Sequence, residues 1–479
     1  MILSTSTSFE VFLRSAVANE LTFYLAALAL LVLTAESCIR LLKRDSFGIT
    51  VGVYVTVFAW YFVDPIIHPE DYNYLPSSSL GHAYGQVLLF LIGFRVVVPA
   101  VTRWILSWRS TGIFAMQRLA PEQILIAVGT LWLLLFALGI YRMGGDVMGA
   151  VFPVDSRAGM TMFLVGGSAT DFLINSASYL FSAVTAFLGM LVFFQRTTLW
   201  RNLAGAMFAI TLPYFFLSGT RSAFLSVILP FIITYLFYGR HLLILRLAIL
   251  AIAFFCLKEG FKFVHVFRLG GFREVLASKN PYELMDEDVG TIGLNMIEEL
   301  CYVNVYLDSG ETSPAYGARY LNEVLNFIPR AIWPSKPLLG IDYAIWRGYQ
   351  SDDCELGVNT TISSGMIGGG VLNFGQIFGP VAAGMLMALW AGLLIRWWEQ
   401  RKSLLRLALF MLGAALTFNL GRDITLLVLW PVVFAYFFVR LIEMLATKRF
   451  GRLPQVQTVA SPSAGPSVSW SADPVIARH

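Results

Sequence analysis

The sequence predicts an all-α polytopic membrane protein, and three observations support this prediction. Of the 479 residues, 57% are hydrophobic and only 13% are charged, whereas about 25% charged residues are usual in a soluble domain. Apolar stretches of roughly 16 to 22 residues recur along the chain, which is the length needed to cross a hydrocarbon core of about 30 Å. Short basic segments follow every second stretch, as expected for a chain that crosses a membrane repeatedly.

About 11 transmembrane helices are expected, within a range of about 10 to 12. The predicted spans lie near residues 19–37, 47–63, 83–101, 123–141, 172–194, 203–218, 222–238, 242–257, 377–396, 403–419 and 424–445. They divide the chain into an N-terminal membrane part (1–257, about 8 spans), a large loop (258–376), a C-terminal membrane part (377–447, about 3 spans) and a tail (448–479).

The connections between the predicted spans indicate the orientation of the chain. Basic connections at 39–45, 103–118, 195–201, 239–241, 396–402 and 448–452 alternate with connections that lack such runs. The positive-inside rule places the basic set in the cytoplasm and the large loop on the outer side. The tail is rich in Pro, Ser and Ala, so we expect a disordered cytoplasmic segment.

Two arginines lie at tight turns that this orientation places on the outer side. Arg221 ends the turn SGTR between two apolar runs, and Arg422 lies in the turn NLGRD before the last span. An arginine at the centre of a membrane helix costs roughly 2.5 to 3.5 kcal/mol. These residues are therefore expected at the membrane surface, where each binds an anionic ligand or pairs with a nearby acid, as Arg422 could with Asp423.

The large loop is too long for a passive connection. NMIEELCYVNVYL (295–307) and YLNEVLNFIPRAIW (320–333) have apolar residues at helical spacing, which predicts amphipathic helices on the membrane face. A disulfide between Cys301 and Cys354 is conceivable only if the loop faces an oxidising compartment. The glycines at 368–370 are more typical of helix packing or a turn than of a phosphate cradle.

The segment FIPRAIWPSKP (327–337) combines three prolines with Arg330 and Lys336. A rigid backbone with fixed cations suits an anionic head group, because a guanidinium binds phosphate oxygens through two donors. No CxxC, HExxH or Cys/His cluster predicts a metal site, and the net charge of +4 gives no reason to expect nucleic acid.

From about Leu217 to Asp423, the order of these features resembles the Wzy-type O-antigen and exopolysaccharide repeat-unit polymerases. The resemblance is carried by SGTRSAFL, FIPRAIWPSKP, GVLNFGQIFGPVAAGMLMALWAGLLIRWWE and the late LGRD turn. It implies a GT-C-like membrane glycosyltransferase with its active site at the periplasmic face of the bacterial inner membrane. Such an enzyme transfers a growing glycan from undecaprenyl diphosphate onto a new lipid-linked repeat unit, without an obligatory cofactor or metal.

The resemblance also implies roles for individual residues. Arg221, Arg330 and Arg422 correspond to the arginines assigned to the diphosphate, whose charge grows as the glycosidic bond breaks. Further candidate substrate-binding residues are Ser218, Gly219, Thr220, Arg268, Arg273, Trp333 and Lys336. His265 and Glu298 are candidates for the general base, although a structural His265 and a Glu298 on the polar helix face are the simpler interpretations. Family members often carry an acid where this chain has Gly368–Gly370.

Three alternatives remain open at this point. An O-antigen ligase needs the same cationic site and tends to carry a functional histidine in the outer loop, and His265 could be that histidine. A flippase or transporter of lipid-linked sugars would favour internal repeats, and no convincing repeat is present. A glycosyltransferase using polyprenyl-monophosphate sugars would place paired acids in the first outer loop, where Glu70 and Asp71 lie. Expected partners are lipid-linked glycans, membrane lipid and a chain-length-determining co-polymerase of the Wzz type.

Overall fold

The computed structural model describes most of the chain, and every regular element in the described part is helical. This finding confirms the all-α prediction. The described residues are 15–108, 119–152, 169–217, 221–239, 241–242, 244–253, 260, 295–325, 333, 341–348, 362–424 and 426–450.

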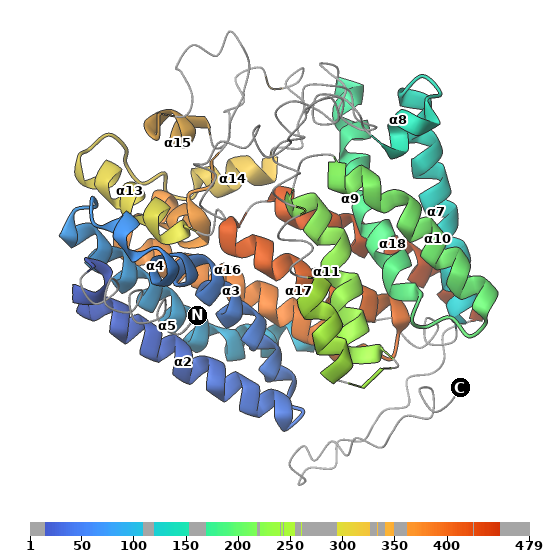
Figure 1. Cartoon of the computed structure of the whole chain (residues 1–479), viewed down its shortest axis with the longest axis horizontal. Helices are drawn as coiled ribbons and strands as arrows, with labels where there is room; N and C mark the ends of the chain where they lie inside the picture. The colour runs from blue at the N-terminus through green and yellow to red at the C-terminus, as the bar shows by residue number, and fades with distance from the viewer. Residues whose placement is uncertain are drawn as a thin grey trace.

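The helices divide into long apolar helices and short connecting ones (Figure 1). The longer helices are α2 (Leu21–Leu42), α3 (Val51–Tyr61), α5 (Ser77–Ser107), α7 (Pro121–Arg142), α9 (Ala169–Leu191), α10 (Thr198–Leu217), α11 (Arg221–Tyr238), α13 (Met296–Asp308), α16 (Gly365–Glu399), α17 (Leu404–Arg422) and α18 (Leu426–Phe450). The short ones are η1 (Val17–Asn19), η2 (Ser46–Thr50), α4 (Val63–Ile67), η3 (Pro69–Tyr72), α8 (Val147–Val151), α14 (Ala318–Val324) and α15 (Ile341–Trp346).

Six helices in the described part are long and apolar enough to cross a membrane: α2, α5, α7, α16, α17 and α18. Shorter apolar helices cover Ser46–Tyr61, Ser176–Leu191, Ala223–Tyr238 and Ile244–Ala253. The chain is thus a polytopic membrane protein by the length and composition of its helices. Each of the eleven predicted spans overlaps a helix, but the number that cross the bilayer stays a prediction.

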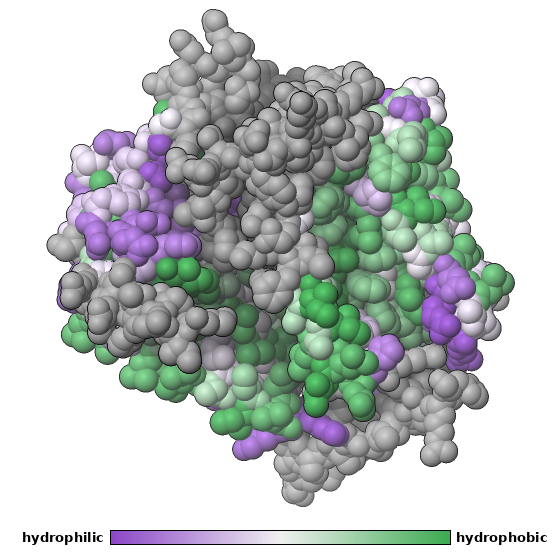
Figure 2. Space-filling model, viewed as in Figure 1, coloured by the Kyte–Doolittle hydropathy of each residue, from purple (hydrophilic) through white to green (hydrophobic). Residues whose placement is uncertain are grey.

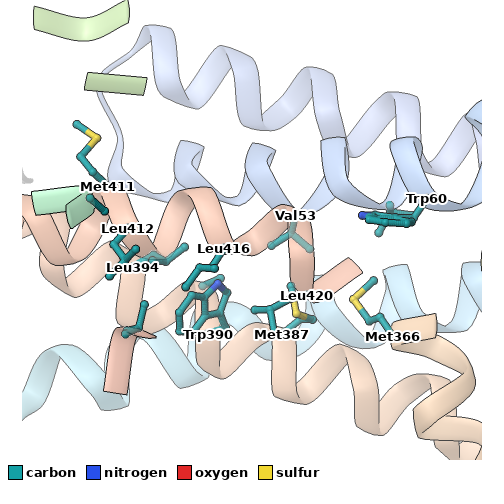
Figure 3. Packing of buried hydrophobic residues seen from close by; sticks show 14 of the residues in the cluster. Val53, Trp60, Met366, Met387, Trp390, Leu394, Met411, Leu412, Leu416 and Leu420 are labelled. Atoms are coloured by element: carbon teal, nitrogen blue, oxygen red, sulfur yellow. The ribbon is translucent and has the colours of Figure 1, made fainter. Parts of the chain in front are cut away.

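α17 lies at the centre of the molecule, between a group formed by α2, α3, α5 and α16 and a group formed by α7, α9, α10, α11 and α18 (Figure 1). In the most apolar 18-residue stretch of α17, 83% of the residues are buried, compared with 17% in that of α2. Figure 3 shows Leu416 and Leu420 of α17 beside Met387 and Trp390 of α16. The Trp390 indole also donates a hydrogen bond to the Thr417 hydroxyl at 2.9 Å. A helix covered on all sides needs this continuous apolar surface.

α16 consists of two helical segments that fold back on each other at Gly375, whose φ of 79° and ψ of 176° are not helical. A side-chain carbon on Gly370 would lie only 2.3 Å from the Gly379 carbonyl oxygen, so the two segments touch through their backbones. Glycine is required at such an approach because any larger residue would clash. The prediction of helix packing by the glycines at 368–370 is confirmed for Gly370. The first segment of α16 begins at Gly365, within the range 258–376 that the sequence assigns to the large loop.

α13 occupies the predicted position. It packs against α5 and α16 and buries Ile297, Leu300 and Val303 against them, and its location on the membrane face stays a prediction. Cys301 is a free, buried cysteine whose sulfur lies 3.6 Å from the Ser79 carbonyl oxygen, so the structure does not contain the disulfide considered with Cys354. Cys354 lies outside the described residues.

The surface reflects this arrangement. Figure 2 shows hydrophobic residues over α11 and the neighbouring helices of the second group, and hydrophilic residues gathered where α4 and α13 lie. Large apolar side chains such as Leu21, Leu31 and Leu42 of α2 are more than half exposed, which fits a helix that faces lipid. The largest hydrophilic patch in this view lies over α4 and α13, and smaller ones lie at the right and lower edges of the molecule.

Candidate functional site

A small polar cavity of about 150 Å³ lies where α14, α15, the start of α16 and the turn after α17 meet. Its polar lining includes Arg319, Tyr320, Glu323, Asp342, Ser364, Asn373 and Asp423. Pockets for drug-sized ligands have roughly 300 to 1,000 Å³. The cavity is therefore smaller than such pockets and has room for only a small group, with any larger ligand extending outside it.

Three oxygen atoms from separate elements converge above Gly369. A side-chain carbon built on this glycine would lie 3.8 Å from the Tyr320 hydroxyl oxygen, 3.9 Å from Asp423 Oδ1 and 3.9 Å from Ser364 Oγ. The cavity thus brings a carboxylate, a phenol and an alcohol close to the face of Gly369, where no side chain fills the space between them.

Asp423 follows the last residue of α17, where the backbone becomes extended. Burial raises the pKa of its carboxyl from 3.8 to about 6, although the Ser363 hydroxyl, the charge of Arg422 and the Ile424 amide each lower it. Ser363 also donates a hydrogen bond to the Arg422 carbonyl oxygen at 3.0 Å, which fixes the turn. A carboxylate whose pKa lies near neutrality is suited to accept and release a proton.

Tyr320 supplies an unused hydrogen-bond donor. Its hydroxyl oxygen is buried and has no hydrogen-bond partner among the described residues. Burial, together with the nearby carboxylates of Asp423 and Glu323, raises its pKa, so the phenol stays neutral. A buried hydroxyl without a partner costs roughly 1 to 3 kcal/mol, and such an unmet group points to a ligand or water at this position.

Asn373 connects the elements around the cavity. Its side-chain amide donates to the Gly369 carbonyl oxygen at 2.8 Å, and its side-chain oxygen accepts from the Tyr320 backbone N–H at 3.4 Å. At the rim, the Arg319 guanidinium pairs with Asp342 and lies 5.5 Å from the Trp346 ring centre. Arg319 is therefore neutralised by a cavity carboxylate, which leaves the acidic and hydroxyl groups dominant inside.

A second polar network supports the cavity from behind. Glu299 of α13 accepts hydrogen bonds from the Tyr343 hydroxyl at 2.5 Å and from Arg347 Nε at 3.0 Å. The Arg347 guanidinium also lies 3.4 Å from the Tyr302 ring centre. Burial raises the pKa of Glu299 despite these partners. This network fixes α15 on α13 and so positions Tyr343, which lines the cavity.

The structure brings some of the predicted site residues together and separates others. Arg422 is exposed and directly precedes Asp423, at the edge of the cavity. Arg221 begins α11, which packs against α17, but its side chain lies outside the described part. Trp333 is half-buried. The remaining predicted residues Ser218, Gly219, Thr220, His265, Arg268, Arg273, Arg330 and Lys336 lie outside the described residues.

Glu298, the second candidate for the general base, does not line the cavity. Its carboxylate accepts hydrogen bonds from the Tyr74 hydroxyl at 2.7 Å and from Asn295 Nδ2 at 2.6 Å, and it pairs with Arg347 at 3.3 Å. These partners give it a structural role. Glu70 and Asp71 lie in η3 and are exposed.

Sequence reasoning missed Asp423, Tyr320, Ser364 and Gly369 as members of one site. Asp423 was considered only as an ion-pair partner of Arg422, because the two are adjacent in sequence. An acidic residue directly after an apolar helix could have indicated a site. Ionisable residues at membrane spans are costly to bury and therefore often have a function. Among the described residues, no group of three or more His, Cys, Asp or Glu side chains could hold a metal ion.

The fold and the cavity define a polytopic helical membrane protein with a polar site at one end of its central helix. No protein-family model, curated protein or solved structure matches the chain. Any assignment of its activity depends on the chemistry of the cavity and on the sequence resemblance described above.

Proposed function

We propose that the chain is a GT-C-like glycosyltransferase of the bacterial inner membrane that polymerises undecaprenyl-diphosphate-linked repeat units at the periplasmic face. The observation that carries this proposal is Asp423, a carboxyl with a pKa of about 6 in a polar cavity, directly beside Arg422. The reaction needs a base for the acceptor hydroxyl and a cation for the leaving diphosphate, and these two residues supply both.

In the proposed reaction, Asp423 takes the proton from a hydroxyl of the distal sugar on the new lipid-linked repeat unit. The resulting oxygen attacks the anomeric carbon of the growing glycan, and the bond from that carbon to the diphosphate oxygen breaks. The leaving undecaprenyl diphosphate gains negative charge, which Arg422 stabilises together with Arg221 and Arg330. Asp423 then releases its proton to water.

The other cavity groups orient the acceptor sugar. The Tyr320 hydroxyl is free to donate to a sugar oxygen, and Ser364 Oγ lies close to the same face of Gly369. The small volume admits only a small group of the acceptor rather than a complete repeat unit. The lipid tails and the rest of each glycan would lie outside the cavity, along the apolar helices and the outer loop.

Complementation of a deletion strain tests this function. Strains carrying wild type, Asp423→Asn, Arg422→Ala or the control Arg103→Gln would be compared at matched membrane levels, with lipid-linked and surface glycans analysed by mass. Arg103 is an exposed arginine far along α5, outside the cavity. We expect polymer in wild type and in the control, and single repeat units on the lipid carrier in Asp423→Asn.

Other results would identify the alternatives. Full-length polymer that remains on the carrier in the deletion strain would indicate a ligase. Single repeat units confined to the cytoplasmic side would indicate a flippase. Normal polymer in Asp423→Asn would contradict the assignment of this residue as the base. A strain that also lacks its Wzz-type co-polymerase would show whether chain length, rather than polymerisation itself, depends on that partner.

A further inference from the structure

A cluster of arginines lies at the opposite end of α17 from the cavity. Arg396 lies in the last turn of α16, Arg406 lies in the first turn of α17, and Arg440 lies just past the middle of α18. With a rise of 1.5 Å per residue, the 19 residues of α17 separate this cluster from Asp423 by about 29 Å. The two polar sites of the central helices are therefore independent of each other.

Two of the three guanidinium groups of this cluster share one carboxylate. Arg406 Nη2 and Arg440 Nη1 both donate to the same oxygen of Glu443, at 2.6 Å and 2.7 Å. Arg396 instead donates to the Ile105 carbonyl oxygen, and its guanidinium is near the positive charges of Arg406 and Arg440 as well as the negative charge of Glu443. The side chains of Arg406 and Glu443 are only 3% and 2% exposed. Buried charges without counter-charges are costly, so this excess of positive charge requires an anion.

Unmet hydrogen bonds lie at the same place. Arg406 Nε is buried without a hydrogen-bond partner among the described residues, and so is the Ser403 hydroxyl. Ser403 is the N-cap of α17 and makes no side-chain cap hydrogen bond, although it is only 1% exposed. The N-terminus of a long helix favours a negative charge. The helix end, the unpartnered Arg406 donor and the uncompensated arginines therefore all favour the same kind of ligand.

The surroundings of Arg440 distinguish a lipid from a free ion. The Arg440 side chain is 36% exposed, so the cluster is open to the surface there. On the same helix, Phe437, Leu441 and Met444 are 64%, 49% and 55% exposed. Their spacing of three or four residues places them on one side of α18, where an acyl chain could lie. Basic pockets between the ends of membrane helices are typical binding sites for phospholipid head groups.

We propose that Arg396, Ser403, Arg406 and Arg440 bind the phosphate of a membrane phospholipid whose head group also carries a hydrogen-bond donor. The phosphate oxygens accept from the arginines and from the start of α17. The head-group donor meets the second oxygen of Glu443, which is also buried without a partner among the described residues. Phosphatidylglycerol, with its hydroxyl groups, has both features, whereas phosphatidylcholine lacks the donor.

The test uses the purified full-length chain in detergent micelles, with native mass spectrometry to count bound lipid. Wild type, Arg440→Gln, Arg440→Lys and the control Arg103→Gln would each be titrated with phosphatidylglycerol, phosphatidylcholine and inorganic phosphate. We expect wild type and the control to retain phosphatidylglycerol in preference to phosphatidylcholine. Arg440→Gln should bind it about ten-fold more weakly, a change of about 1.4 kcal/mol. Arg440→Lys should lie between these values because it keeps the charge but loses the paired donors.

Each other outcome would overturn a named part of the proposal. Equal binding by Arg440→Gln and Arg103→Gln would show that lipid retention depends on charge in general and not on this cluster. Protection of wild type against heat by inorganic phosphate as strongly as by phosphatidylglycerol would overturn the lipid as the source of the phosphate. Equal retention of phosphatidylcholine would overturn the need for a head-group donor.

Discussion

α17 has an acidic end beside a cavity and a basic end at which Arg406 is buried. At Asp423, carboxylates and hydroxyls surround a cavity with room for a ligand. At Ser403 and Arg406, the Arg406 guanidinium is buried, and Glu443 is the one carboxylate that pairs with it among the described residues. The same apolar helix holds both sets of polar groups in place. Burial alone therefore does not define function. The end of α17 at Asp423 has a cavity that can admit a reacting group, whereas the buried charge at Arg406 needs a counter-charge to be stable.

The largest expected effect is at the basic end. Glu443→Gln removes the carboxylate shared by Arg406 and Arg440 and leaves the buried Arg406 guanidinium without this counter-charge, whereas Arg440 is partly exposed. We expect a loss of about 3 to 5 kcal/mol in the free energy of unfolding, measured in lipid-free micelles. The control Asp45→Asn breaks a half-exposed pair with Arg40 and should cost less than about 1 kcal/mol. Equal losses in the two variants would remove the distinction between this end and an ordinary surface.

At the acidic end, Asp423→Asn should change how stability depends on pH. The unfolded carboxyl releases its proton near pH 3.8, whereas the folded one keeps it until about pH 6. The folded state therefore binds more protons in this window, and the stability of wild type falls as pH rises through it. Relative to Asp423→Asn, we expect a fall of up to about 3 kcal/mol between these values. Parallel unfolding profiles of the two proteins would contradict a buried carboxyl.

The wall of the cavity depends on the close approach within α16. Gly370→Ala would place a carbon 2.3 Å from the Gly379 carbonyl oxygen, which should destabilise the protein by about 1 to 3 kcal/mol. Gly85→Ala is the matched control, because nothing lies within 4 Å of the added carbon in α5 and alanine favours helix by about 1 kcal/mol. Thermal unfolding of both variants measures the difference. A stable Gly370→Ala protein would show that the two segments of α16 separate readily.

The smallest expected change in stability is at Tyr320. Tyr320→Phe removes a buried hydroxyl that has no hydrogen-bond partner among the described residues, so the variant should be as stable as wild type or more stable by about 1 kcal/mol. Polymer synthesis in the complementation assay should nevertheless fall, because the sugar loses a hydrogen-bond donor. A variant that loses stability and keeps full synthesis would reassign Tyr320 to packing.

Much of the fold was predictable because apolar length is a local property of the sequence. The sequence around α17 is apolar over the length of a membrane span, and the structure places a helix there. The fold-back of α16 was missed, because the segment from Gly368 to Phe378 is apolar apart from Asn373 and Gln376, and hydropathy does not register a reversal of direction. Gly375 was the only local sign of that reversal, and its positive φ becomes evident only in three dimensions.

The candidate site was less predictable because its members are far apart in sequence. Tyr320, Gly369 and Asp423 belong to three separate elements, and only the packing of these elements brings their oxygen atoms to one point. The arginines could be selected from the sequence because basic residues usually lie in cytoplasmic connections and these were placed on the outer side. Neutral residues such as Tyr320 and Ser364 carry no comparable signal before the structure is seen.

The way α16 lies on α5 constrains the path of the chain between them. Gly384 of α16 approaches Phe90 and Phe94 of α5, and Gly392 approaches Thr102 and Ile105. Later residues of α16 therefore contact later residues of α5, so the two helices run parallel. Two parallel helices that cross a membrane enter it from the same side. The chain between them must therefore pass through the bilayer an odd number of times, whichever helices do so. One, three or five crossings satisfy this parity, whereas any even number would require one of the two helices to be turned around.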